Sequence, residues 1–162
     1  MIKKVSSQDD FNILAKLLNE AFATVAEDFG LTKENSPTNN AFITGEELEL
    51  QLTGNREFYV YENYGEKVGF IAVEKSLSTL GTFYIEKMAV TPACRHYGIG
   101  LLLMDFATNR IKELGGKRIS IGLIDSNTIL KEWYSKQGFA EFEHKTFDHL
   151  PFNVCMMEKN II

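Results

Sequence analysis

An arginine and two glycines follow a β-rich segment and precede an apolar helical segment, with the spacing Arg95-x-x-Gly98-x-Gly100. Glycine has no Cβ, so the backbone of such a loop can come close to a ligand. The first amides of the following helix have no intrahelical acceptor, and they favour an anion such as a phosphate or pyrophosphate. The spacing therefore predicts either an anion-binding loop or an ordinary tight turn.

Two familiar phosphate-binding loops do not match these residues. A P-loop ends in Gly-Lys followed by Ser or Thr, whereas here Gly100 is followed by Leu101 and Leu102. The Rossmann fingerprint needs a third glycine at the position of Leu103. The interpretation of the loop must therefore rest on a second motif.

Asn127 and Tyr134 form that second motif, after a β-rich segment at residues 117–124 and before Gly138 and Phe139. The two residues are seven positions apart, so a helix places their side chains on one face, about 10 Å apart along its axis. A phenol at this position could give a proton to a departing group. The alternative for Tyr134 is a core aromatic with no chemical role.

Together, the two segments resemble the GNAT superfamily of acetyl-CoA-dependent N-acetyltransferases, over about residues 82–139. Leu130 stands where that family usually has a small residue, a departure that affects helix packing more than chemistry. The resemblance implies that the loop amides hold the pyrophosphate of acetyl-CoA and that Asn127 binds the pantetheine arm. The implied cofactor-binding residues are Met88, Val90, Arg95, His96, Tyr97, Gly98, Ile99, Gly100, Leu101, Asn127 and Leu130.

Glu86 is the carboxylate best placed to act as a base. Period-2 alternation puts Tyr84, Glu86, Met88 and Val90 on one strand face, where burial would raise the pKa of Glu86 towards the range of a general base. This segment resembles that of spermidine/spermine acetyltransferases, which have a catalytic glutamate nine residues before the loop arginine, as Glu86 is before Arg95. The alternative is a Glu86 that is salt-bridged or exposed at the rim.

The resemblance implies that an acetyl group passes directly from acetyl-CoA to a primary amine, with no covalent enzyme intermediate. Glu86 would take the amine proton, Tyr134 would protonate the departing thiolate, and the Met88 and Val90 amides would meet the thioester carbonyl and the pantetheine. The preferred acceptor is a small-molecule amine. A protein or peptide acceptor and a non-catalytic acyl-CoA sensor are the alternatives, and many relatives are homodimers.

Hydrophobic periodicity predicts the elements that must position these residues. Helical patterns cover residues 11–21, 45–52 and 99–114 and a segment that begins at 126 or 127, and β-rich segments cover residues 2–5, 57–62, 67–75, 82–90, 117–124, 139–145 and 152–159. This order predicts an α+β fold with a mixed, largely antiparallel central sheet of six to seven strands flanked by about four helices. The resemblance implies a GNAT-type sheet, splayed between its fourth and fifth strands.

Composition limits the class of protein. With 162 residues, 44% of them hydrophobic, the chain suits one domain at residues 1–162. The start lacks the apolar run of a signal peptide, and no segment reaches the roughly 18 apolar residues of a membrane span, so we expect a cytoplasmic protein without a membrane partner. The net charge of −5 disfavours a nucleic-acid partner.

Cys94 and Cys155 form no CxxC unit and the three histidines are scattered, so the sequence predicts neither a metal site nor a disulfide. The weakly patterned segment at residues 26–44 corresponds to the region that bounds the acceptor pocket in the family. Acidic residues are frequent in the first third of the chain, where they form either a solvated surface or a rim that attracts a cationic amine. They include Glu27, Asp28, Glu34, Glu46, Glu47 and Glu49.

Overall fold

A computed structural model describes residues 1–161. In chain order its elements are β1 (Ile2–Lys4), α1 (Phe11–Asp28), the 3-10 turn η1 (Asn40–Phe42), α2 (Gly45–Gln51), β2 (Arg56–Asn63), β3 (Glu66–Lys75), β4 (Thr82–Val90), the 3-10 turn η2 (Pro92–Cys94), α3 (Ile99–Glu113), β5 (Arg118–Ile124), α4 (Thr128–Ser135), β6 (Ala140–Thr146) and β7 (Asn153–Asn160). The predicted α+β class is confirmed. The largest difference is α1, which continues well beyond the apolar pattern that predicted it.

All seven strands form one sheet in the order β1-β2-β3-β4-β5-β7-β6. Every neighbouring pair is antiparallel except β4 and β5, which are parallel. The sheet is therefore mixed and largely antiparallel, as predicted.

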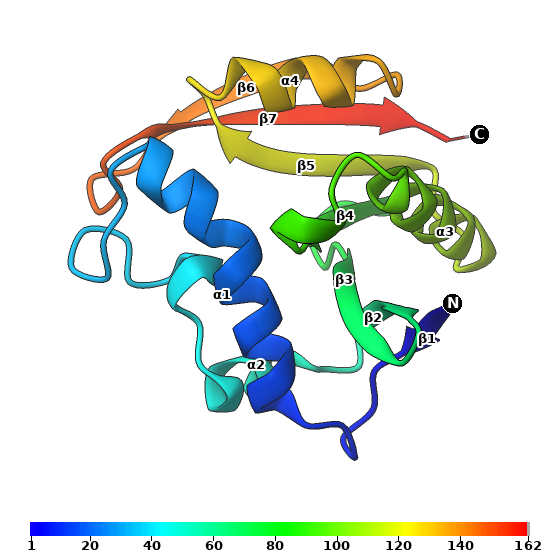
Figure 1. Ribbon diagram of the computed structural model, residues 1–162. Helices are drawn as coiled ribbons and strands as arrows, with labels where there is room; N and C mark the ends of the chain where they lie inside the picture. The colour runs from blue at the N-terminus through cyan, green and yellow to red at the C-terminus, as the bar shows by residue number, and fades with distance from the viewer. Residues whose placement is uncertain (162) are drawn as a thin grey trace.

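The parallel pair holds together at one end only. Three residue pairs join β4 to β5, from Thr82↔Arg118 to Tyr84↔Ser120, and beyond Tyr84 the two strands diverge. Figure 1 shows β5, β7 and β6 as one layer beneath α4, with β4 turning away from them. The splay between the fourth and fifth strands is thus present, and it leaves one edge of β4 without a ladder partner from Ile85 onward.

Two apolar clusters fix the helices on opposite faces of the sheet. Asp10 caps the start of α1 by accepting hydrogen bonds from the amides of Asn12 and Ile13, and the buried stripe of this helix packs on β2 and β3 with Leu48 of α2. On the other face, Leu103, Ala107 and Ile111 bury α3 against β3, β4 and β5, and residues of α4 complete that cluster. Among residues 1–161, the helices are all too short or too polar to span a membrane.

A β-bulge interrupts β4 and overturns the predicted alternation of its side chains. Phe70 pairs with Ala89 and Ala72 pairs with Glu86, so β4 has one extra residue here, and Lys87 adopts a positive φ of 53°. After the bulge, Met88 and Val90 join the cluster beneath α3, whereas Ala89 joins the cluster beneath α1. The expectation that Glu86 shares a face with Met88 and Val90 is therefore wrong, because the bulge reverses the phase of the strand.

Candidate active site

A cavity of about 560 Å³ lies where β4 and β5 separate. Its walls come from the end of α1, the segment before η1, the middle of β4, the second half of β5, and α4. The segment at residues 26–44 contributes Ser36, Thr38, Asn39 and Asn40, which agrees with the expectation that this region bounds the pocket. The cavity also contains Glu86, Met88, Asn127, Leu130 and Tyr134, so five predicted site residues from β4 and from α4 with its N-cap line one space.

Glu86 lies between a cation and a second carboxylate. Arg56 Nε donates to Glu86 Oε1 at 3.2 Å, and the same guanidinium forms an ion pair with Glu74, the residue that pairs with Arg56 across β2 and β3. Burial and the hydrogen bond to Glu74 raise the pKa of Glu86 to about 7, although the charge of Arg56 opposes this shift. The pKa of Glu74 is lowered because protonated Glu86 donates to it and Arg56 favours its charge. Glu86 is thus both ion-paired and exposed to the cavity.

Two further polar side chains face the cavity. Lys87, at the bulge, donates from Nζ to Asn40 Oδ1 at 2.7 Å, and burial lowers the pKa of this lysine to about 8. The Ser36 hydroxyl is buried and has no hydrogen-bond partner among residues 1–161. A buried hydroxyl without a partner costs about 1–3 kcal/mol, so this oxygen is a group that a ligand could satisfy.

Tyr134 is buried from α4 between the rings of Trp133 and Phe139, at centroid distances of 5.0 and 5.6 Å. Burial raises the pKa of the Tyr134 phenol, which therefore stays protonated in the neutral range. Asn127 is the N-cap of α4 and accepts from the amide of Leu130 at 3.2 Å. Its side-chain NH₂ has no acceptor among residues 1–161, so it remains available to a ligand in the cavity.

The glycine-bearing loop forms the start of α3, as the sequence predicts. Gly98 is the N-cap with a positive φ of 82°, a conformation that a residue with a Cβ adopts only with strain. The first capping bond runs from the amide of Leu102 to the Gly98 carbonyl, and the amides of Ile99, Gly100 and Leu101 have no acceptor within residues 1–161. Three adjacent N–H groups are thus available to an anion.

The side chains of the loop behave differently from one another. Those of His96, Tyr97 and Leu101 are exposed, whereas Ile99 is buried in the core, so only its backbone is open to a ligand. Arg95 donates to the carbonyls of Ala21 and Val90 and to the Thr24 hydroxyl. Its guanidinium therefore holds the loop against α1.

Met88 connects the loop with the cavity. A Cβ placed on Gly100 would lie 3.8 Å from Met88 Cε and 3.4 Å from Trp133 Cζ2. Met88 itself lines the cavity, whereas Val90 does not. A long, thin ligand could therefore bind the α3 amides with one end and pass Met88 into the splay with the other.

The sequence analysis missed the partners of Glu86 and misplaced the acidic group. The cavity carboxylates are Glu74 and Glu86, and none of the acidic residues named in the first third of the chain lines it. Glu74 and Arg56 could have been found by aligning the two hairpins, since Arg56↔Glu74 and Ala72↔Glu86 are cross-strand pairs. Ser36 had no comparable signal, because its burial depends on how an irregular segment packs.

Known proteins resemble this chain in domain sequence and in fold. The model of the acetyltransferase (GNAT) domain matches residues 54–141. The fold is similar to the ribosomal-protein-S18-alanine N-acetyltransferase from Escherichia coli, at 13% identity and a TM-score of 0.76 over 99% of this chain and 93% of that one. It is also similar to the aminoglycoside 6'-N-acetyltransferase from Enterococcus faecium, at 18% identity and a TM-score of 0.71 over 100% and 97% of the two chains.

An aminoglycoside 6'-N-acetyltransferase solved with coenzyme A gives the same identity, coverage and TM-score as the enterococcal protein. No sequence among the curated proteins matches this chain. At these identities the solved structures show a shared fold, and the domain model shows the family.

Proposed function

This chain belongs to the GNAT acetyltransferase family and is therefore an N-acetyltransferase, and we propose that it moves the acetyl group of acetyl-CoA directly to the amine of a small molecule. The observation that carries this proposal is the cavity at the splay, which contains a carboxylate of raised pKa and a protonated phenol beside the unpaired edge of β4. A volume of about 560 Å³ lies within the ordinary range for small-molecule sites. We expect the thioester to occupy the Met88 end and the amine to approach from the side of Glu86.

The donor is bound by backbone groups in this proposal. The amides of Ile99, Gly100 and Leu101 would hold the pyrophosphate, because aligned N–H groups at a helix start attract negative charge. Arg95 acts as a positioning residue, since its guanidinium is already engaged by α1 and β4. Asn127 and Leu130 would contact the pantetheine arm, and free amides of β4 near Met88 would face the thioester carbonyl.

Acetyl transfer then needs two proton movements. An acceptor amine arrives protonated, and ionised Glu86 would take one proton so that the nitrogen lone pair can attack the thioester carbon. The C–N bond forms, the C–S bond breaks, the nitrogen loses its second proton to solvent, and the CoA sulfur leaves as a thiolate. The Tyr134 phenol is a weaker acid than the CoA thiol, so it would act by donating a hydrogen bond to the sulfur as the C–S bond breaks.

The acceptor side combines negative charge with apolar walls. Glu74 and Glu86 favour a cationic amine, although Arg56 and Lys87 offset part of their charge. Phe22, Val25 and Phe152 offer surface to the carbon skeleton of the amine. The unpaired Ser36 hydroxyl would hydrogen-bond a polar group of the acceptor. Ser36→Ala should then raise the KM for the preferred amine and leave the KM for acetyl-CoA unchanged.

A panel of amines, assayed by release of the CoA thiol and by the mass of the acetylated product, tests this function. Acetylation of small primary amines is the expected result. Turnover only with peptides would favour a protein acceptor, and acetyl-CoA binding without turnover across all amine classes would favour a sensor. Glu74 and Glu86 form a carboxylate pair near the expected position of the thioester. This pair favours an enzyme over a sensor, because a protein that only binds acetyl-CoA needs no base at that position.

A further inference from the structure

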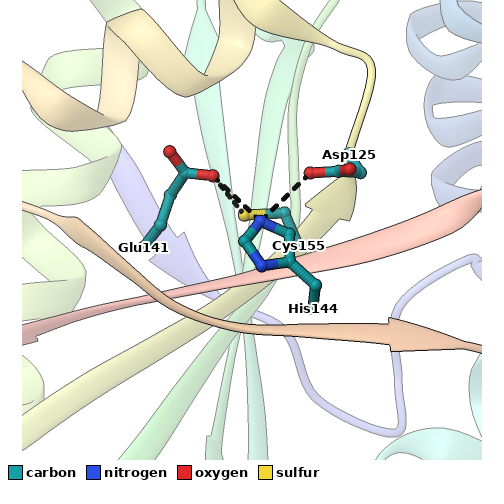
Figure 2. A group of neighbouring side chains, drawn as sticks. All are labelled: Asp125, Glu141, His144 and Cys155. Carbon is teal, nitrogen blue, oxygen red and sulfur yellow. Dashed lines mark hydrogen bonds and ion pairs between the residues drawn. The ribbon is translucent and has the colours of Figure 1, made fainter.

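Four side chains outside the proposed active site converge on one point where β5 ends, beside β6, β7 and α4. They are Asp125, Glu141, His144 and Cys155, and one ligand atom from each lies within 4.8 Å of all the others. Figure 2 shows Asp125 and Glu141 approaching from opposite sides, with the His144 ring in front of the Cys155 sulfur. None of the four has a role in the acetyl transfer proposed above.

A second β-bulge creates this arrangement. Glu141 pairs with Met157 and Glu143 with Met156, so β6 carries one residue more than β7 between these two pairs. Without the extra residue, Glu141 and His144 would face opposite sides of the sheet, since they are three positions apart. The bulge turns both towards the side of Cys155, which pairs directly with His144, and Asp125 joins them from the end of β5.

Three of the six distances between these atoms are close to those between the ligands of a tetrahedral metal ion. His144 Nε2 lies 3.4 Å from Asp125 Oδ1 and 3.2 Å from Glu141 Oε1, and Cys155 Sγ lies 3.2 Å from the same Glu141 oxygen. Zinc bonds of about 2.0–2.3 Å to oxygen, nitrogen and sulfur imply ligand separations of about 3.3–3.6 Å. Cys155 is buried at the base of the cluster, whereas the His144 side chain is 57% exposed, so an ion could enter from solvent.

We propose that these four residues form a binding site for a divalent ion of the zinc type, which ties the end of β5 to β6 and β7. One thiolate, one imidazole and two carboxylates suit Zn²⁺, whereas Mg²⁺ and Ca²⁺ prefer oxygen ligands alone. Binding forms a metal–sulfur bond, and the thiol proton passes to solvent. The proposal departs from the expectation of no metal, because the tertiary fold brings together residues whose sequence spacing is uninformative.

Lys131 of α4 is the internal competitor for this site. Its Nζ lies 2.6 Å from Asp125 Oδ1 and 3.0 Å from Glu141 Oε1, the same oxygens that His144 contacts. A metal ion must therefore displace the ammonium group from these oxygens. Removing the charge with Lys131→Met should tighten metal binding by roughly tenfold, because a competing cation about 3 Å from the ligands is lost.

The site is placed to stiffen one wall of the cavity. Asp125 follows Ile124 and Cys155 follows Val154, and both of these neighbours line the cavity. The Asp125 amide also donates to the Asn153 carbonyl at 2.8 Å. An ion that binds the folded chain and not the unfolded chain raises the unfolding temperature, and the rise grows with the concentration of the ion.

Calorimetric titration of the metal-free chain with Zn²⁺ tests the proposal, with Co²⁺ as a spectroscopic probe of thiolate ligation. We expect one ion per chain, a thiolate-to-cobalt absorption band, and a rise in unfolding temperature. His144→Ala and Cys155→Ser should each weaken binding by about 100-fold or more. His149→Ala and Cys94→Ser are matched controls, because they remove the same residue types outside the cluster.

Cys155 is in the core, so Cys155→Ser could fail to fold. The His144 side chain is largely exposed, so His144→Ala should fold and still tests the site. Absence of saturable binding would mean that the four residues form only a hydrogen-bonded network with Lys131. Binding by His144→Ala equal to that of the parent would also overturn the site. Lys131→Met with unchanged or weaker binding would overturn the position of the ion between the two oxygens.

Discussion

The pH dependence of turnover is the property that the surroundings of Glu86 determine most directly. Burial and the Glu74 carboxylate raise the pKa of Glu86 from 4.5 to about 7. Only ionised Glu86 can accept the amine proton, so kcat/KM should rise as the pH increases through about 7. For a single group with this pKa, the ionised fraction grows about tenfold between about pH 6 and pH 8.

The two neighbours of Glu86 should move this rising limb in opposite directions. Glu74→Gln removes the carboxylate that disfavours ionised Glu86, so the limb should shift to lower pH. Arg56→Met removes the cation that favours it, so the limb should shift to higher pH. Glu86→Gln should abolish the limb and lower kcat by about 10²-fold or more, with acetyl-CoA binding little changed.

Release of the CoA thiol, followed across the pH range at saturating acetyl-CoA, measures these shifts.

The native pKa of Glu86 is raised, so the stability it contributes is present below its unfolded pKa of about 4.5 and is lost as the pH rises through about 7. Glu86→Gln should therefore unfold at or above the temperature of the parent at about pH 8, which separates lost chemistry from lost folding. A limb that stays at the same pH in Glu86→Gln would refute the assignment of the base.

Three further substitutions probe the donor site, the leaving group and the core. Gly98→Asp should abolish acetyl-CoA binding by calorimetry, because it puts a negative charge at the α3 N-terminus. Gly98→Ala imposes the same backbone strain at a positive φ without the charge and should retain more of the binding. Tyr134→Phe should slow turnover by about tenfold or more and leave the limb near pH 7 in place, and unchanged turnover with chemistry rate-limiting would remove Tyr134 from the mechanism. Leu103→Ala, on the buried side of α3, should lower the free energy of unfolding by about 3 kcal/mol in denaturant titration. A loss well under about 1 kcal/mol would contradict the packing described for that helix.

The elements of the fold were predictable because their signals are local. The apolar stripe of α3, the turn at Gly65 between β2 and β3, and the asparagine cap of α4 each lie within a few residues of chain. The extent of α1 was underestimated, because its last two turns pack on the segment before η1 and carry a weaker apolar pattern. Tertiary contacts support a helix there that periodicity alone did not predict.

The residue types and spacing of the loop and of the Asn127–Tyr134 segment were enough to predict the family and a glycine-bearing helix start. They were sufficient because a glycine at a positive φ and unpaired amides at a helix start follow from the local chain alone. Arg95 shows the limit of such reasoning. It lies in the loop before α3, but its hydrogen bonds to α1 depend on a helix more than 70 residues away in the sequence.

Only the tertiary structure decided which groups meet at the cavity and at the cluster of Asp125, Glu141, His144 and Cys155. A bulge adds one residue to a strand and reverses the faces of all the residues beyond it, so alternation read from the sequence fails at Met88 and at His144. The raised pKa of Glu86 likewise depends on burial at the cavity and on Glu74, with Arg56 opposing the shift, and both of these neighbours come from other strands. The sequence determined which chemical groups and which elements are present, and strand register determined which of those groups lie within reach of one another.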